Sequence, residues 1–115
     1  MQTIIGVVEV GKKHGAELGF PTANIPLDNA DLSGIYVGRV LVGDDSYNAA
    51  LYADPPRGVL EAHLLDFTGD LYGKMITIEI GEKVRDKKQF KDDAEARETI
   101  KDDIARIREY GAKHR

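Results

Sequence analysis

The chain has 115 residues, of which 42% are hydrophobic, and it carries a formal net charge of −4 and no cysteine. This length is close to that of one ordinary domain, so we expect a single domain over residues 1–115. The acidic balance argues against general nucleic-acid binding, which requires a basic surface. The lack of cysteine excludes disulfides and thiolate metal sites. Without a signal-peptide pattern or a run of ~18 apolar residues, we expect a cytoplasmic monomer that does not bind membranes.

Alternating apolar and polar residues predict a chain rich in short β-strands. The run at 35–42 is rich in β-branched residues and ends at a Gly-Asp-Asp turn, so residues 47–53 can pair with it. Short strands spaced by turns favour a small closed barrel, although periodicity alone does not separate a barrel from a sandwich. The predicted strands span residues 3–10, 35–42, 47–53, 59–67 and 71–84.

A helix is predicted near the C-terminal end. Asp92 or Asp93 is a suitable N-cap, because a short carboxylate can accept a hydrogen bond from the free N–H groups of the first turn. Gly111 is a natural stop. Apolar residues recur at helical spacing, and this stripe is expected to face the strands. Its members are Ala96, Ile100, Ile104 and Ile107.

The segment at 15–24, Gly-Ala-Glu-Leu-Gly-Phe-Pro-Thr-Ala-Asn, concentrates glycines and oxygen-bearing side chains. Thr22 and Asn24 are two residues apart, so in an extended segment both point to the same face. Hydroxyl and amide oxygens suit Mg²⁺ bound to phosphates, and a glycine-rich backbone can offer N–H groups to the phosphates. The segment is neither a Walker A loop nor a dinucleotide-binding fingerprint, and an ordinary turn is the alternative interpretation.

Basic residues gather at two places on this acidic chain. Lys12 and Lys13 lie among the glycines, and Arg85, Lys87 and Lys88 precede the predicted helix. A local basic loop on an acidic protein fits an anionic small ligand better than a polymer. For the first pair, a solvated hairpin tip is the alternative.

Glu61 is the candidate for chemistry on the predicted strand at 59–67. In strand alternation it shares a face with His63 and with two apolar residues, Leu65 and Phe67. A carboxylate on such a face is either exposed at the strand end or retained for a purpose. His63 can instead satisfy a buried hydrogen bond, and with three histidines in the chain we expect no zinc site.

Several segments, in the same order, resemble the riboflavin kinase (flavokinase) family over nearly the whole chain. The most specific is Pro-Thr-Ala-Asn at 21–24, at the end of a stretch from Gly11 that is similar to the family's ATP loop. The run Leu-Glu-Ala-His-Leu-Leu-Asp-Phe at 60–67 is similar to the strand that carries the family's catalytic glutamate. Further similar segments are Gly-Ile-Tyr at 34–36, Asp-Leu-Tyr-Gly at 70–73, Val84-Arg85 with Phe90, and the final helix.

This resemblance implies a mostly β fold, a six-stranded antiparallel Greek-key barrel with a C-terminal α-helix packed on it. It also implies the phosphorylation of riboflavin to FMN by ATP with Mg²⁺, which makes both small molecules the expected partners and leaves ATP or CTP open as donor. Glu61 is then the general base, and Thr22 and Asn24 hold the Mg²⁺. The implied nucleotide-binding residues are Gly11, Lys12, Gly15, Gly19, Pro21, Thr22 and Asn24, and the implied flavin-binding residues are Arg85 and Phe90.

One segment departs from the family pattern. At 51–57 the asparagine and glycine of the family's Asn-Ile-Gly-x-x-Pro-Thr stretch are absent, and the connection to the catalytic strand is short. A catalytically idle flavin- or nucleotide-binding module on the same barrel is therefore an alternative. An interaction domain that binds oligonucleotides is another, but it would require a basic face with interleaved aromatic residues. We expect the glycine loop, Thr22, Asn24 and Glu61 to converge on one pocket at an end of the barrel.

Overall fold

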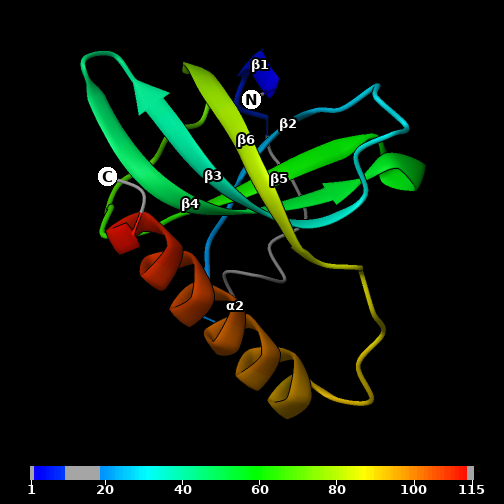
Figure 1. Cartoon of the computed structure of the whole chain (residues 1–115). Helices are drawn as coiled ribbons and strands as arrows, with labels where there is room; N and C mark the ends of the chain where they lie inside the picture. Colours follow the sequence, from blue (N-terminus) through cyan, green and yellow to red (C-terminus); the bar gives the residue numbers. More distant parts are fainter. Residues whose placement is uncertain (1, 10–18, 114–115) are drawn as a thin grey trace.

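The computed structural model describes residues 2–9 and 19–113 of the chain. Among these residues it contains six β-strands, one short 3-10 helix and one long α-helix (Figure 1). The short connections join β3 to β4 and β4 to β5, and these strands are also neighbours in the sheet. The elements are β1 (Gln2–Val7), β2 (Ala23–Pro26), β3 (Gly34–Val42), β4 (Asp45–Asp54), η1 (Pro55–Arg57), β5 (Val59–Leu64), β6 (Met75–Arg85) and α2 (Asp93–Lys113).

The strands form one antiparallel sheet in the order β1-β6-β3-β4-β5-β2. Within it β6 returns to lie beside β3, so that β3 to β6 have the spatial order of a Greek key. The two edges of the sheet meet where the Glu9 N–H donates a 2.8 Å hydrogen bond to the Asn24 carbonyl. The sheet is therefore a nearly closed barrel, which confirms the predicted fold.

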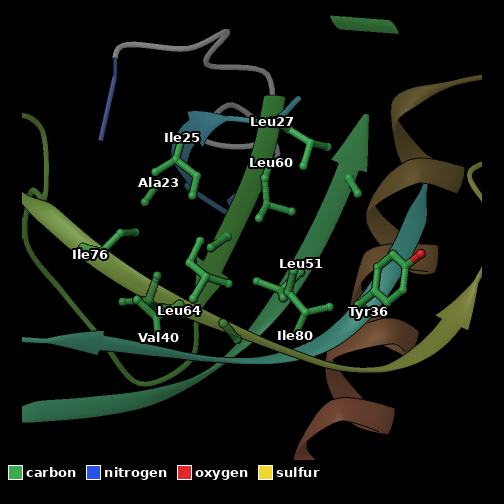
Figure 2. Close-up of a cluster of buried hydrophobic side chains, with 14 of the residues drawn as sticks. Ala23, Ile25, Leu27, Tyr36, Val40, Leu51, Leu60, Leu64, Ile76 and Ile80 are labelled. Atoms are coloured by element: carbon green, nitrogen blue, oxygen red, sulfur yellow. The ribbon is translucent and has the colours of Figure 1, made fainter. Parts of the chain in front are cut away.

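The barrel interior is filled by the apolar residues that alternate along each strand. In β5, Leu60, Ala62 and Leu64 are buried in the main core, whereas Glu61 and His63 are only partly buried and point outward. Figure 2 shows how the inward side chains of β2, β3, β4, β5 and β6 meet inside the barrel. Because alternate residues point to opposite faces, the outer wall of the barrel remains available for polar groups.

Three predicted strand boundaries were wrong, and one strand was missed. β5 ends at Leu64 rather than Phe67, because the chain turns at Asp66, whose φ is +59°. β6 begins at Met75 rather than Leu71, since residues 71–74 form a turn in which the Lys74 N–H donates to the Leu71 carbonyl. β1 ends at Val7, three residues earlier than predicted. β2 has four residues, too few for a periodic signal.

Helix α2 begins as predicted, because the Asp92 carboxylate accepts a 2.9 Å hydrogen bond from the Glu95 N–H. The helix lies across the outside of the barrel (Figure 1) and contacts β4. Ile107 is fully buried in a second apolar cluster, with Ala50 and Leu65. The predicted apolar stripe therefore packs on the barrel. No helix among residues 2–9 and 19–113 is long and apolar enough to cross a membrane.

Candidate functional site

A cavity of about 450 Å³ lies on the barrel. The barrel wall bounds it on one side, and α2 and the segment before α2 bound it on the other. Tyr52 of β4 and Glu61 of β5 line it from the outer wall, together with Ala53 of the main core. Its lining includes strand termini that meet at one end of the barrel, since Gly34 begins β3, Asp54 ends β4 and Arg85 ends β6. The lining residues are Phe20, Thr22, Gly34, Ile35, Tyr52, Ala53, Asp54, Arg57, Glu61, Arg85, Lys87, Lys88, Phe90, Ala96 and Ile100.

Thr22, Asn24 and Glu61 meet at one side of this cavity. Asn24 of β2 is paired with Glu61 of β5 in the sheet register, which places the two side chains next to each other. The Thr22 hydroxyl lies 3.2 Å from Asn24 Oδ1 and 3.1 Å from Glu61 Oε1, and it can donate to either oxygen. These atoms are hard oxygen donors, which is the chemistry that Mg²⁺ prefers. Thr22 and Glu61 line the cavity, whereas Asn24 is buried beside it.

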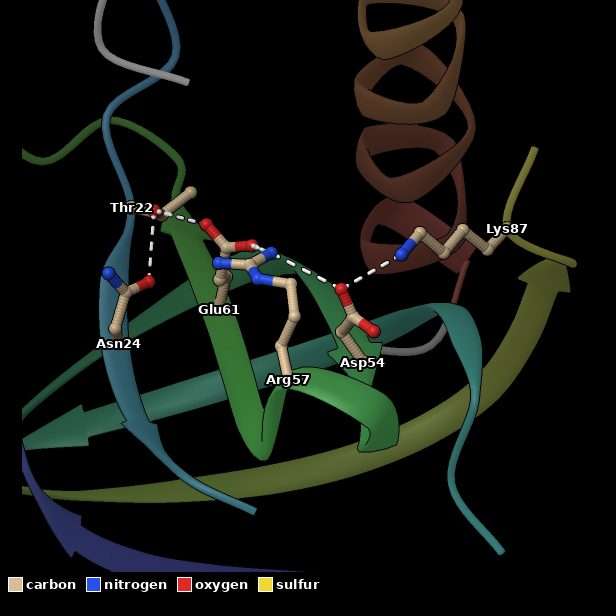
Figure 3. A network of polar contacts seen from close by, with 6 residues as sticks. All are labelled: Thr22, Asn24, Asp54, Arg57, Glu61 and Lys87. Carbon is tan, nitrogen blue, oxygen red and sulfur yellow. Dashed lines mark hydrogen bonds and ion pairs between the residues drawn. The ribbon is translucent and has the colours of Figure 1, made fainter. Parts of the chain in front are cut away.

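A chain of charged residues continues from Glu61 along the cavity wall (Figure 3). Arg57 Nη1 donates to Glu61 Oε2 and to Asp54 Oδ2, each at 3.2 Å, and Lys87 Nζ donates to Asp54 Oδ2 at 2.8 Å. Burial alone would raise the pKa of the Asp54 carboxyl, but Lys87 and then Arg57 outweigh it and hold that pKa below its usual value. Asp54 is thus an anion that fixes two cations at the cavity.

Tyr52 and Asp54 each have a buried oxygen without a hydrogen-bond partner among the described residues, the Tyr52 hydroxyl and Asp54 Oδ1. Both residues line the cavity, and Tyr52 is directly opposite Glu61 in the sheet. Burial raises the pKa of the Tyr52 phenol, and the Asp103 carboxylate raises it further, so this hydroxyl stays protonated. An unsatisfied buried polar atom costs about 1–3 kcal/mol, so this wall keeps polar groups at a cost to stability.

Arg85 and Phe90 also line the cavity, on the side formed by the end of β6 and the segment before α2. The Arg85 guanidinium is held by the Asp103 carboxylate of α2 through two hydrogen bonds, of 2.9 and 2.8 Å, and by the Asp86 carbonyl. The pair between Arg85 and Asp103 therefore holds the helix against the barrel. Phe90 presents its ring to the cavity, with Lys88 Nζ 5.7 Å from the ring centroid.

Other residues of the sequence hypothesis lie elsewhere. Gly19 is exposed, and its φ of +94° favours glycine. The Pro21 carbonyl accepts a 2.7 Å hydrogen bond from His63 Nδ1, which accounts for His63 without a metal. Gly11, Lys12 and Gly15 fall outside the described residues.

The cavity is also lined by Tyr52, Asp54 and Arg57, which were not among the predicted site residues, and by Lys87 of the basic group before the helix. Asp54 and Arg57 lie in the Asp-Pro-Pro-Arg segment, which was interpreted as a short connection that departs from the family pattern. Asp54 lies three residues before Arg57, and Glu61 lies four residues after it. Oppositely charged residues at these spacings were a signal that short-range ion pairs could form.

The fold and the site together define a small Greek-key barrel domain with a charged cavity under its terminal helix. Residues 2–111 match the family model described as riboflavin kinase (flavokinase). The chain belongs to this family.

Two relatives are similar to this chain in sequence, and one solved structure has a similar fold. The chain is 34% identical over 107 residues to the trifunctional protein RibF/MnmA of Mycoplasmoides gallisepticum, across 85% of this chain and 16% of that protein. It is 32% identical over 118 residues to the bifunctional riboflavin kinase/FMN adenylyltransferase of Pseudomonas fluorescens, across 95% of this chain and 38% of that protein. A crystal structure described as a macrolide-efflux protein from Streptococcus pneumoniae superposes with a TM-score of 0.80 at 25% identity, over 92% of this chain and 38% of that one. The chain thus spans less than two fifths of each of these proteins.

Proposed function

We propose that this domain transfers the terminal phosphoryl group of ATP to riboflavin, giving FMN and ADP. The observation that carries the proposal is the meeting of Thr22, Asn24 and Glu61 beside the cavity, with the Thr22 hydroxyl within 3.2 Å of both partner oxygens. Phosphoryl transfer needs positioning and charge neutralisation more than covalent chemistry. A carboxylate beside two neutral oxygen donors provides a base and a cation site in one place.

The proposed roles follow from the chemistry of each side chain. Thr22 and Asn24 would hold Mg²⁺, which when bound neutralises charge on the ATP phosphates. Glu61 would accept the proton of the substrate hydroxyl, or orient that hydroxyl, as the phosphoryl group is transferred. The glycines from Gly11 to Gly19 would offer backbone N–H groups to the phosphates.

The flavin would occupy the part of the cavity farther from Thr22. Phe90, Ile35 and Ile100 line it with apolar surface suited to a flat aromatic ring. Arg85 would help to build this part of the site, and its pair with Asp103 keeps it in place.

The decisive experiment is to incubate the purified protein with riboflavin and either Mg-ATP or Mg-CTP, and to measure FMN by chromatography with fluorescence detection. FMN formation that requires Mg²⁺ and nucleotide is the expected result. Tight flavin binding without FMN formation would favour the idle binding module instead, an alternative supported by the short η1 connection between β4 and β5. Failure to bind either riboflavin or nucleotide would overturn both assignments.

A further inference from the structure

Both oxygens of the Glu61 carboxylate already have partners. Oε1 accepts from the Thr22 hydroxyl at 3.1 Å, and Oε2 accepts from Arg57 Nη1 at 3.2 Å. The Glu61 side chain is only 17% exposed, so little of it is open to another group. Each carboxylate oxygen keeps a second lone pair, but on a side chain this enclosed a substrate hydroxyl gains the most room when one of the two partners moves away.

Arg57 is the partner that can move. Its side chain is 36% exposed, and it stands on the three-residue η1 rather than on a strand. The guanidinium has five N–H donors in a rigid plane, yet its hydrogen bonds to Asp54 and Glu61 both come from Nη1. Figure 3 shows a further guanidinium nitrogen pointing toward the side of Thr22 and Asn24, where the phosphates are proposed to bind.

We propose that Arg57 is a further catalytic residue, which leaves Glu61 Oε2 and binds the phosphoryl group that is transferred. This inference rests on the proposed function. A hydroxyl that donates to Glu61 lies about 2.6–3.2 Å from the carboxylate, and the phosphorus that it attacks lies about 3–3.5 Å beyond. Since Nη1 is 3.2 Å from the same carboxylate, the phosphoryl oxygens fall within reach of this guanidinium.

The step is balanced without any further reactant. A bond forms between the substrate hydroxyl oxygen and the terminal phosphorus, and the bond from that phosphorus to the bridging oxygen of ATP breaks, with its electron pair leaving on ADP. The hydroxyl proton goes to Glu61. Arg57 forms no covalent bond, and it neutralises charge on the phosphoryl oxygens while its departure frees Oε2 for the hydroxyl.

Asp54 and Lys87 are the positioning residues of this arrangement. Asp54 is nearly buried and is held by Lys87 at 2.8 Å, so it forms a fixed anchor for the more exposed Arg57. Because Arg57 is also paired with Asp54, its guanidinium stays at the cavity when it leaves Glu61. The tether reduces the conformational entropy that is lost when the guanidinium binds phosphate.

The test compares Arg57→Gln and Arg57→Lys with the matched control Arg39→Gln. Arg39 forms an ion pair with Glu79 on the barrel surface, is 55% exposed and does not line the cavity. Calorimetry would measure the affinity of each protein for ADP and for the β,γ-imido analogue of ATP, and the FMN assay would measure kcat. The ratio of the affinity for the ATP analogue to the affinity for ADP should be about 10- to 100-fold lower in Arg57→Gln than in the wild type. Its kcat should fall about 10³-fold.

Arg57→Lys should recover part of both losses, because it keeps the charge but not the planar fork, and Arg39→Gln should match the wild type. An Arg57→Gln protein that melts like the wild type and keeps both its kcat and its nucleotide preference would overturn the inference. If the wild type forms no FMN, the proposed function fails, but the nucleotide affinities still decide whether Arg57 contacts the terminal phosphate.

Discussion

The Glu61 carboxylate stands in a row of polar side chains that crosses three adjacent strands, with Asn24 on one side and Tyr52 on the other. Replacing it with glutamine keeps the size and most of the hydrogen bonding but removes the charge and the proposed base. Glu61→Gln should therefore lower turnover about 10²–10⁴-fold, the usual contribution of a general base. The affinity for riboflavin and nucleotide should change little, because a base acts mainly in the transition state.

Glu79→Gln is the matched control for this variant, since Glu79 is also a strand glutamate paired with an arginine, but lies outside the cavity. FMN formation and equilibrium binding would be measured for both variants. Near-normal turnover in Glu61→Gln would remove Glu61 from the catalytic step.

Thr22 offers a separate test of the proposed cation site. Its hydroxyl contacts only the side chains of Asn24 and Glu61 among the described residues, so Thr22→Ala should change Tm little. The Mg²⁺ concentration required for half-maximal turnover should instead rise clearly, because a hard oxygen ligand is lost. Mg²⁺ titrations and thermal melts would separate the two effects. Loss of Tm with an unchanged Mg²⁺ requirement would make Thr22 a purely structural residue.

Asp54 predicts a pH-dependent contribution to stability. Its folded pKa lies below the ordinary value of 3.8, so its ion pairs stabilise the protein above that pH. This contribution is lost as the pH falls through the folded pKa. Asp54→Asn should thus lower the free energy of unfolding most at pH 7, and the difference from the wild type should shrink below pH 3.8. Urea unfolding at pH 7 and pH 3 would measure this, and a difference that does not depend on pH would contradict it.

At the residue scale, the sequence predicted those site residues that a local motif carries, Thr22 and Asn24 in one segment and Glu61 in another. It did not predict that Lys87 meets Asp54, because 33 residues separate them and only the folded barrel brings them together. Tyr52 was also not predicted as a residue of the site. Its register opposite Glu61 depends on the hairpin between β4 and β5, which no side-chain pattern in the sequence defines.

Among the elements, α2 is the one on which the cavity most depends, because it supplies one wall. The Asp103 carboxylate, 2% exposed, accepts two hydrogen bonds from Arg85 at the end of β6. Removing one partner of a buried ion pair leaves the other charge uncompensated. Asp103→Ala should therefore cost about 3–5 kcal/mol of unfolding free energy, measured by urea denaturation.

Asp66→Asn is the control for this prediction, because asparagine removes the charge and tolerates the φ of +59° at this position. Asp66 also makes two hydrogen bonds to an arginine of α2, Arg108, but its side chain is 75% exposed. Solvent screening makes such a pair contribute little, so the Asp66 variant should unfold like the wild type. Equal losses in the two variants would show that burial does not set the strength of these pairs.

The existence of α2 and its apolar stripe were predictable, because its cap and its 3.6-residue period are local signals. Its role as a cavity wall was not. That role depends on the pair between Asp103 and Arg85, which lie 18 residues apart and are brought together only by the fold.

At the scale of the whole molecule, closure of the barrel depends on close contact between β3 and the side chains inside. A Cβ at Gly38 would overlap the side chain of Leu51, so a larger residue has no room there. Gly38→Ala should destabilise the fold by about 1–3 kcal/mol through overpacking. The double variant Gly38→Ala/Leu51→Val should lose less than the sum of the single variants. Additive losses in urea unfolding would show that the two positions do not compete for space.

The closed topology itself could be predicted only through the family resemblance. Strand periodicity is the same in a sandwich and in a barrel, and the contact that joins the edges, between Glu9 and Asn24, lies between residues far apart in the chain. The register shifts between β3 and β6 at Ile35–Gly38, which help to curl the sheet, have no simple sequence signature.

The alternation in β5 means that one strand holds two independent sets of positions. Leu60, Ala62 and Leu64 maintain the fold from inside, while Glu61 and His63 face outward and contribute little to the core. The outward positions can accordingly change at every second residue without repacking the interior. A combinatorial library at the outward positions of β4 and β5 would be expected to yield folded proteins far more often than one at the inward positions, which makes this barrel a favourable starting point for directed evolution.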